Sequence, residues 1–399
     1  MLLRSLAASA VTALTPLLGW AQAATDAKDE GLKVMGLDVT GYVDASYNHM
    51  SRSNLFTSGT PSRVFDLNRD GLTLQQAAVK ISKTPAVGFG GVLNLTAGRD
   101  ADVIASYKTD PQKGKLCNVV TGVNADGSTC DRDKFDVTQA FGQYANGPWT
   151  IMLGKYVTLA GAEVIWTPTN TNFSHSILFG YAIPFTHSGL RVNYAMSDTL
   201  SFAVGLNNGW DDIKDTNGSK TIELGTTWAP SKMVSLGVQG YFGKERAAGL
   251  TKDELPPAFQ LEGDRKLLDA VLTITATDKL TFVFNYDTAS QDNTSNVTPA
   301  GAGKSEWDGL AGYAIYQFNP QWRLSARAEY FNDKQGYRTG VVQKWKEGTL
   351  TMAWLPRKPI ELRGEVRRDK SNVASFLDTN GASAHDTNTS YGLQFLYKF

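Results

Sequence analysis

The sequence has no long run of apolar residues after its first 24 positions. No apolar window of about 18 residues occurs there, and the mean hydropathy is -0.26, so a bundle of membrane-spanning helices is excluded. A net charge is also absent, because 39 Lys and Arg balance 39 Asp and Glu without a basic cluster. Phosphate binding needs a clustered basic excess, so nucleic acid is excluded as a partner.

Cysteine and histidine are both scarce, which limits the chemistry that the chain offers. Cys117 and Cys130 are the only cysteines, and they lie close together in a polar stretch. They predict one loop disulfide in an oxidising compartment, whereas a metal site is disfavoured because no histidine is near. The four histidines are scattered at His49, His175, His187 and His385.

No catalytic pattern is found among these residues, since neither Gly-x-Ser-x-Gly nor His-Glu-x-x-His occurs. We therefore predict no enzyme activity, no cofactor and no metal. A run with Asp211, Asp212, Asp215, Asn217 and Gly218 has a weak likeness to a calcium loop. A solvated acidic external loop is the favoured interpretation of that run.

The N-terminus has the form of a secretory signal peptide. Arg4 precedes an apolar stretch that ends at Trp20, and Ala21-Gln22-Ala23 has the small-x-small form of a cleavage site. The alternative is a buried N-terminal helix, which Pro16 disfavours. We predict a cleaved signal peptide over residues 1–23 and one domain over residues 24–399.

Alternation of period two dominates the rest of the chain and predicts β-strands with one apolar and one polar face. The final segment shows it clearly, with apolar residues at every second position from Tyr391 to Phe399. The same rhythm occurs at 200–206, 222–228, 234–238, 280–286, 322–330 and 360–366. Ser, Thr, Asn, Arg and Glu occupy the positions between the apolar ones.

Short turns alternate strictly with long polar connections. The short turns lie at 84–85, 146–148, 197–198, 229–231, 277–278, 319–320 and 356–357. The long connections lie at 51–71, 100–134, 159–180, 208–219, 244–264, 288–304, 332–342 and 368–387. This asymmetry predicts an all-β fold: a transmembrane antiparallel up-and-down β-barrel of about 16 strands in the outer membrane of a Gram-negative bacterium, with short periplasmic turns and long external loops.

Aromatic residues gather beside the short turns, where they are expected to form a girdle at the periplasmic interface. They are Trp149, Tyr194, Phe202, Trp228, Phe282, Tyr316, Trp322, Trp354 and Phe399. Aromatic pairs inside a soluble sandwich are the alternative, which the clustering at one strand end disfavours. Since lipid leaves no backbone group unpaired, the first strand near 39–47 must bond to the last near 391–399. About sixteen strands enclose a lumen too wide for side chains alone to fill.

Several further segments are typical of outer-membrane barrels. Phe399, after its alternating apolar residues, is similar to the C-terminal signal that the barrel-assembly machinery recognises in outer-membrane proteins. The others are Gly41-Tyr42-Val43-Asp44, Gln143-Tyr144, Gly154-Lys155, Gly161-Ala162-Glu163, and the stretches 170–176, 184–191 and 207–211. Together these segments resemble the β-barrel porin family of the OmpL-like type. The resemblance covers most of the mature chain and implies a porin-like role, with a homotrimer as a family expectation.

The third long connection, residues 157–182, is expected to fold into the barrel and constrict the pore. It contains Glu163 and His175 but no Lys or Arg, and it is unusually apolar for an external loop. Packing inside the barrel explains this composition better than contact with a neighbouring subunit, the alternative.

Charged residues at alternate strand positions are expected to face the lumen, because Arg or Lys in mid-bilayer costs about 2–4 kcal/mol. We hypothesise a basic arc that faces Glu163 and sets ion selectivity. The arc consists of Arg191, Arg323, Arg327 and Arg363. In the alternative, these arginines pair with Glu329, Glu361 and Glu365 in ladders that only stiffen the wall.

The function that these patterns favour is passive diffusion of small hydrophilic solutes or ions through a water-filled channel. The alternative is a barrel that serves adhesion or surface interaction through its external loops. Expected partners are outer-membrane lipid, lipopolysaccharide and, during biogenesis, the barrel-assembly machinery.

Overall fold

The computed structural model describes residues 31–104, 117–118, 123–124, 135–246, 262–295 and 298–399. The predicted signal peptide and Cys130 lie outside these residues, so the cleavage and the disulfide stay predictions. Among the described residues, no helix is long and apolar enough to cross a membrane.

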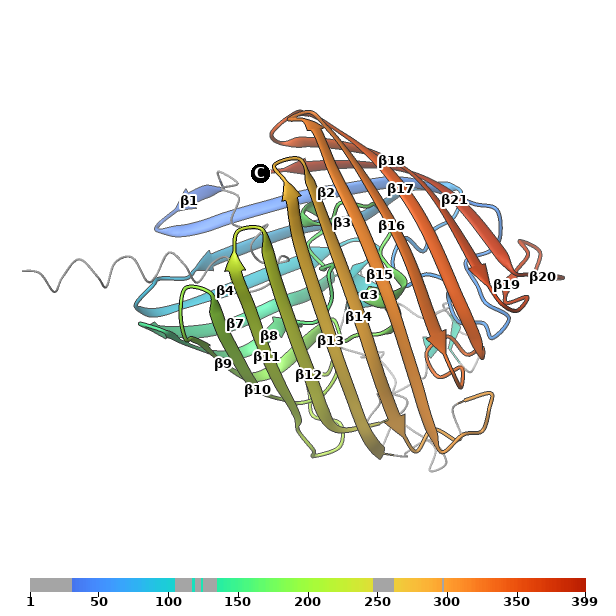
Figure 1. The fold of residues 1–399 in the computed structure, drawn as a ribbon, viewed down its shortest axis with the longest axis horizontal. Helices are drawn as coiled ribbons and strands as arrows, with labels where there is room; N and C mark the ends of the chain where they lie inside the picture. The colour runs from blue at the N-terminus through green and yellow to red at the C-terminus, as the bar shows by residue number, and fades with distance from the viewer. Residues whose placement is uncertain (1–30, 105–116, 119–122, 125–134, 247–261, 296–297) are drawn as a thin grey trace, which may run out of the picture.

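A single antiparallel sheet forms the body of the molecule and closes on itself (Figure 1). The closing seam pairs the first barrel strand with the last, with Tyr42 opposite Lys398 and Tyr47 opposite Leu393. Closure therefore occurs where the sequence predicts it, and the fold is a 16-strand barrel. Its strands are β2 (Leu37–Met50), β3 (Gly71–Lys83), β4 (Gly88–Ala97), β7 (Phe135–Asn146), β8 (Trp149–Val157), β9 (Thr186–Ala195), β10 (Leu200–Asn207), β11 (Thr221–Ser231), β12 (Val234–Arg246), β13 (Glu262–Thr277), β14 (Leu280–Asp292), β15 (Lys304–Asn319), β16 (Trp322–Asp333), β17 (Gln343–Arg357), β18 (Ile360–Ser371) and β21 (Thr387–Lys398).

The remaining elements are short and are not among the sixteen strands of the barrel. They are β1 (Leu32–Val34), which pairs with β2, the hairpins β5 (Cys117–Asn118) with β6 (Val123–Asn124) and β19 (Phe376–Leu377) with β20 (Ala384–His385), and the helices α2 (Ala101–Ile104), η1 (Thr167–Thr169) and α3 (Ile177–Tyr181). Of these, η1 and α3 belong to the connection between β8 and β9. Figure 1 shows α3 behind the front strands of the barrel.

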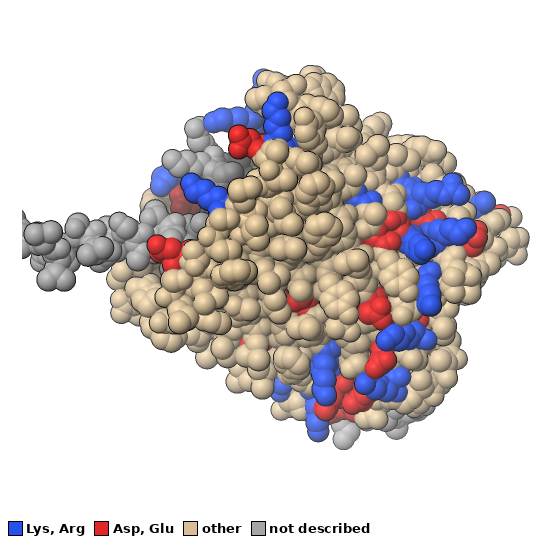
Figure 2. Space-filling model, viewed as in Figure 1, with Lys and Arg blue, Asp and Glu red and all other residues tan. Residues whose placement is uncertain are grey.

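Side chains alternate between the two faces of the wall, as the period-two pattern predicts. Along β17, Leu350, Met352 and Trp354 are exposed, whereas Thr349 and Thr351 are buried. The same alternation makes the outer surface a broad band without charge, which Figure 2 shows across the front strands. An apolar outer band of this kind suits contact with lipid.

The aromatic residues beside the short turns lie on the outer face. The rings of Trp149 and Tyr194 on neighbouring strands are 4.4 Å apart, and those of Trp322 and Trp354 are 6.1 Å apart. All four lie at the strand ends that the short turns join. A ring of amphipathic aromatics at that level can keep its polar atoms in water while its carbons contact lipid.

Candidate functional site

The connection from β8 to β9, residues 157–186, folds into the barrel and lies against its inner wall. Within α3, every residue is buried, from Ile177 to Tyr181. Ser176 caps the helix, since its hydroxyl accepts a hydrogen bond from the Phe179 amide at 3.0 Å. We call residues 157–186 the inner loop. Its apolar composition is explained because its side chains form a core inside the barrel.

Two glutamates of the wall hold the backbone of the inner loop. Glu329 on β16 accepts the amides of Ile177 at 3.0 Å and Leu178 at 3.3 Å. Glu365 on β18 accepts the amides of Phe173 at 2.7 Å and Ser174 at 3.0 Å. Amides at the start of a helix or in a tight turn have no partner within the segment, so these carboxylates satisfy donors that burial would leave unpaired.

Three arginines of the wall donate to carbonyl oxygens in the same stretch of the inner loop. Arg327 donates to the Ser174 oxygen at 2.6 Å, Arg363 to the Asn172 oxygen at 3.0 Å, and Arg367 to the His175 oxygen at 2.8 Å. The glutamates accept hydrogen bonds from the amides, and the arginines donate hydrogen bonds to the carbonyl oxygens. Side chains of β16 and β18 therefore hold both the donors and the acceptors of the backbone at residues 172–178. Such charge-assisted bonds are the stronger kind.

Glu163 lies at the centre of this contact. Its carboxylate is 2.8 Å from the Arg327 guanidinium and accepts the Ser176 amide at 2.8 Å and the Tyr313 hydroxyl at 3.1 Å; His175 Nδ1 is also 3.1 Å away. Burial opposes ionisation of this group. Arg327, His175 and the Ser176 amide outweigh that effect and lower the pKa of Glu163 from 4.5 to about 2. The group is therefore charged at neutral pH.

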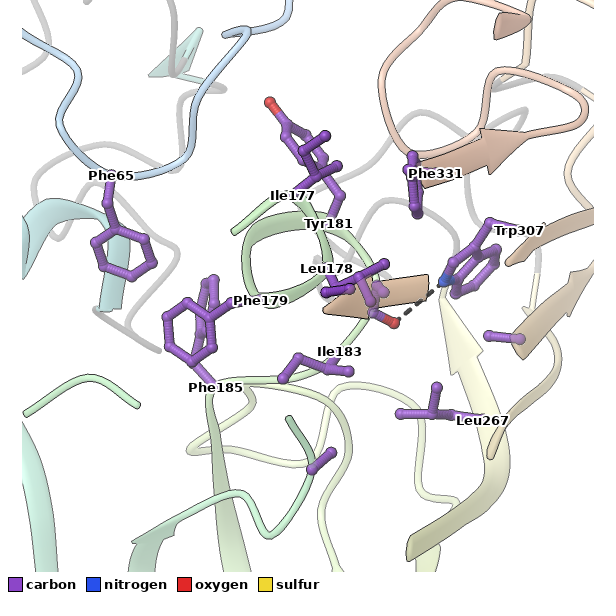
Figure 3. Close-up of a cluster of buried hydrophobic side chains, with 14 of the residues drawn as sticks. Phe65, Ile177, Leu178, Phe179, Tyr181, Ile183, Phe185, Leu267, Trp307 and Phe331 are labelled. Atoms are coloured by element: carbon purple, nitrogen blue, oxygen red, sulfur yellow. Dashed lines mark hydrogen bonds between the residues drawn. The ribbon is translucent and has the colours of Figure 1, made fainter. Parts of the chain in front are cut away.

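The apolar side of the inner loop packs into a core that other segments complete. Figure 3 shows Leu178, Phe179, Ile183 and Phe185 of the inner loop between Phe65 on one side and wall residues on the other. The wall side includes Trp307, whose indole donates to the Ala182 oxygen at 3.1 Å. Burial of each large apolar side chain contributes about 1.5–3 kcal/mol. The interior of the barrel is therefore an apolar core joined to a polar ladder.

Two inward-facing glycines leave room for inner-loop side chains. A Cβ at Gly309 on β15 would overlap the Leu178 side chain, and one at Gly392 on β21 would overlap the Phe173 ring. These two positions therefore set how closely the inner loop approaches the wall. By contrast, a Cβ at Gly348 on β17 would meet nothing within 4 Å.

A second segment, residues 51–70, also folds inward, which the sequence reasoning missed. Arg63 pairs with Asp66 at 2.6 Å and with Asp369 of β18 at 3.3 Å. Phe65 packs on the ring of His175 with 4.4 Å between centroids. The signal was available in part, because Phe56 and Phe65 are unusual in an exposed loop. A cavity of about 10 Å³, with room for one water, remains between this segment and the inner loop.

The four arginines proposed as an arc have different partners. Arg327 alone contacts Glu163, since Arg191 pairs with Glu223 at 2.8 Å, and Arg323 and Arg363 both pair with Glu361. Arg327 is also 3.1 Å from Glu329 and from Glu347. The charges thus form a ladder of arginines and glutamates along the wall, and this ladder reaches Glu163 of the inner loop through Arg327. The arrangement contains part of the proposed arc and part of the alternative ladder. Arg367, Glu347 and Glu223 are ladder members that the proposed arc omitted.

One acidic pair of the wall stands outside this ladder. Asp269 on β13 and Asp287 on β14 are directly opposite each other and fully buried. Asn285 donates to Asp269 at 2.7 Å, whereas Asp287 faces Asp269 and receives no hydrogen bond from any other described residue. Two buried carboxyl groups that face each other cannot both be ionised, so the pair shares a proton and a hydrogen bond. Uptake of that proton on folding costs free energy at neutral pH.

The acidic run after β10 does not converge on one point. Asp211 accepts the amides of Phe185 and Thr186, whereas Asp215 accepts two amides of its own turn and pairs with Lys220 at 2.6 Å. No three His, Cys, Asp or Glu residues that could hold a metal ion lie together in the described ranges. The run serves to tie the loop to β9 and to Lys220.

Comparison with known proteins agrees with this architecture. The model of the family described as "Putative beta-barrel porin-2, OmpL-like" matches residues 36–399. No curated protein sequence matches the chain.

Several solved structures have a similar fold. The anion-selective porin from Comamonas acidovorans has a TM-score of 0.60 at 10% identity, covering 91% of this chain and 99% of that one. The outer membrane channel DcaP of Acinetobacter baumannii has a TM-score of 0.57 at 15% identity, covering 92% and 99%. The trimer form of OmpT of Vibrio cholerae has a TM-score of 0.56 at 10% identity, covering 91% and 99%. At these identities the likeness concerns the fold.

Proposed function

The chain belongs to the family described as "Putative beta-barrel porin-2, OmpL-like" and is a porin-like barrel of the Gram-negative outer membrane, and we propose that it lets small hydrophilic solutes or ions diffuse passively through a narrow channel. The observation that carries the proposal is the inner loop, held inside the barrel by Glu329, Glu365 and three arginines. Because a barrel of sixteen strands encloses more space than its own side chains fill, an inserted loop determines how much of that space conducts.

A narrow channel is favoured over a wide one by the burial of inward-facing side chains. On β16 and β18, the charged residues Arg327, Glu329, Arg363 and Arg367 are all at most 6% exposed. Passage would therefore follow the part of the lumen that the inner loop leaves open. We expect single-channel conductance well below that of a barrel without an inserted loop.

Planar-bilayer recording of the purified protein tests this proposal. The key variant replaces residues 165–183 with a short Gly-Ser linker and keeps Glu163 and the strand ends. We expect small, stable openings for the native chain and a conductance several-fold larger for the variant. The matched control removes residues 379–382 at an exposed hairpin tip, which should leave conductance unchanged. A variant that conducts no better than the native chain would reject the inner loop as the constriction.

Ion selectivity would follow from the charges nearest to open water. Arg323 keeps a 14% exposed side chain, whereas those of Arg327 and Arg363 are fully buried. We therefore assign ion selectivity first to Arg323. The constriction that shapes the path is assigned to Glu163, His175, Arg191, Arg327, Glu329 and Arg363. Arg323→Gln should shift the reversal potential in a salt gradient toward cation selectivity. An unchanged cation to anion ratio would refute this assignment.

A second function, adhesion or surface interaction through the external loops, draws support from the same filled lumen. The apolar core joins Phe56, Phe65 and the inner loop to Trp307 and Trp345 of the wall. If that core closes the lumen, the barrel has no channel and its function lies in the external loops. Bilayers that stay silent with correctly folded protein, before and after removal of residues 165–183, would favour this function.

The oligomeric state is proposed to be a homotrimer, because one similar structure is a trimer form of OmpT. Native mass spectrometry of the protein in mild detergent tests this assignment. A mass of three copies supports it, and a single copy under conditions that keep the barrel folded rejects it.

A further inference from the structure

Four basic side chains form a patch on the outer face of the barrel, at the strand ends far from the periplasmic turns. The outer basic patch consists of Lys344, Lys346, Arg368 and Lys370 on the neighbouring strands β17 and β18. All four are exposed, whereas the residues between them are buried in the interior. Figure 2 shows Lys and Arg side chains gathered over these outer strand ends, beyond the band without charge.

The patch contains more positive charge than the protein neutralises. Lys346 lies directly opposite Lys370, and like charges in that position repel each other. Lys344 faces Asn332 and Arg368 faces Thr389, neither of which is charged. Among the described residues, Asp386 at 3.7 Å from Lys370 is the patch's only ion-pair partner.

Several basic residues elsewhere on the outer face have acidic neighbours. Lys304 is 3.2 Å from Glu306, and Lys334 is 3.3 Å from both Glu306 and Asp308. Lys244 lies opposite Asp264 in the register of β12 and β13. On β17 and β18, by contrast, four basic side chains lie together with one acidic partner among the described residues, which favours an external anion at that place.

The height of the patch matches the boundary between lipid tails and head groups. Lys346 is eight residues from the interfacial Trp354 along β17. At about 3.3 Å per residue and a tilt of about 40°, these residues are separated by roughly 20 Å along the membrane normal, close to the apolar band of about 25 Å. Leu350 and Val366, directly below the patch, are exposed apolar residues that lipid tails can cover.

We propose that the outer basic patch binds the phosphate groups of lipopolysaccharide in the outer leaflet. Lysine ammonium groups attract phosphate as point charges, and the Arg368 guanidinium can donate two parallel hydrogen bonds to it. The acyl chains of the same lipid lie against Leu350 and Val366. The proposal depends on the placement in the outer membrane and is independent of whether the lumen conducts.

The test compares a variant with a matched control of equal charge change. The patch variant carries Lys344→Gln, Lys346→Gln, Arg368→Gln and Lys370→Gln. The control carries Lys232→Gln, Lys279→Gln, Lys304→Gln and Lys334→Gln, at exposed positions outside the patch. We measure lipopolysaccharide retained per barrel after purification in mild detergent. The patch variant should retain about tenfold less than the native chain, and the control should retain the native amount.

A second measurement distinguishes bound lipid phosphate from other ligands. Added lipid A should raise the unfolding temperature of the native barrel and leave that of the patch variant unchanged, whereas dephosphorylated lipid A and inorganic phosphate should affect neither. Equal lipopolysaccharide in both variants, or equal stabilisation by the dephosphorylated lipid or by free phosphate, would overturn the proposal.

Folding of each variant is checked by its heat-dependent mobility in gels. If the fourfold variant does not fold, the double variant Lys346→Gln with Arg368→Gln decides the question by the same two readouts. Bilayer recordings on the same samples keep the two proposals separate. If the native barrel does not conduct but retains more lipopolysaccharide than the patch variant, only the channel proposal is refuted. If the native barrel conducts and the patch variant retains as much lipopolysaccharide as the native chain, only the patch proposal is refuted.

Discussion

Individual charged residues inside this barrel differ in how well their charge is compensated. Asp369 receives hydrogen bonds from Arg367 and from the Trp345 indole, whereas Asp287 faces the carboxyl group of Asp269 and shares a proton with it. Both are buried. An ionised carboxylate that keeps its partners favours the fold, whereas a carboxyl group that has to take up a proton to be buried opposes it at neutral pH.

Asp287→Asn is therefore expected to stabilise the barrel. The amide donates to the oxygen of Asp269 across the strand pair without the proton that the two carboxyl groups must take up on folding. The gain should be about 1–3 kcal/mol, measured as a higher urea midpoint for unfolding in lipid vesicles. Asp369→Asn is the matched control and should lower the midpoint. A lower midpoint for Asp287→Asn would contradict our assignment of a proton shared by Asp287 and Asp269.

The lowered pKa of Glu163 predicts how the inner loop responds to acid. Its pKa is about 2 in the folded protein against 4.5 ordinarily, so its ion pair stabilises the inner loop fully above about pH 4.5. That stabilisation falls as the pH drops from 4.5 through 2, because Glu163 of a released loop takes up a proton in this range whereas Glu163 in the folded protein stays ionised until about pH 2. We expect larger or noisier conductance in this window at constant barrel content.

Glu163→Gln provides the control for that acid response. The variant lacks the titrating group, so its conductance at neutral pH should already resemble that of the native chain in acid. It should also change less than the native chain between pH 4.5 and 2. An identical pH profile in both proteins would show that another group titrates.

At the scale of elements, the inner loop and the wall fit each other by shape as well as charge. Gly309 on β15 and Gly392 on β21 clear the space that Leu178 and Phe173 occupy. Hydrogen bonds from β16 and β18 thus hold the loop, and the glycines on β15 and β21 leave the space into which its side chains pack. Loss of either the hydrogen bonds or the close fit at the glycines is expected to displace the loop.

Gly309→Ala and Gly392→Ala should each push the inner loop away from the wall. Overpacking of this kind costs about 1–3 kcal/mol. Because the strands keep their own hydrogen bonds, the barrel should stay closed while the loop becomes accessible to protease added to detergent-solubilised protein. Gly348→Ala is the control, since its new methyl group meets no neighbour. Protease resistance equal to that of the native chain in both inward variants would reject the seating role.

For the whole molecule, closure depends on the seam between β2 and β21. The amide and the carbonyl of Phe399 bond to Gly41 at 2.9 Å and 2.8 Å. A Cβ at Gly41 would overlap the Phe399 ring, so this glycine allows the terminal aromatic to cover the seam. The last residue thus has a structural role in closure besides the signal role that its position suggests.

Deletion of Phe399 separates these two roles. If the residue is mainly an assembly signal, the amount of folded barrel in cells should fall at least several-fold, while refolding in vitro from urea into lipid should change little. If it mainly closes the seam, both should fall together. The measurement is the heat-dependent gel mobility of the folded barrel, with Tyr397→Ala as the control for loss of an exposed aromatic at the same level.

The sequence determined the wall of this protein and indicated that the third long connection folds inward, but it did not determine which residues meet in the interior. Period-two alternation and short turns are local signals, so they predicted the sixteen strands, their inward and outward faces and the seam. Trp307 and Trp345 were not recognised as inward residues, because they occupy the polar phase of their strands.

Tertiary structure alone decided which distant residues meet. Arg327 and Glu163 are 164 positions apart in the chain, and the inward segment with Arg63 reaches Asp369 across 306 positions. The outer basic patch likewise unites residues 344–346 and 368–370 of two strands, whose pairing brings Lys346 opposite Lys370. Local periodicity specifies the direction of a side chain, but its partner depends on how the closed barrel and its inserted loops bring remote segments into contact.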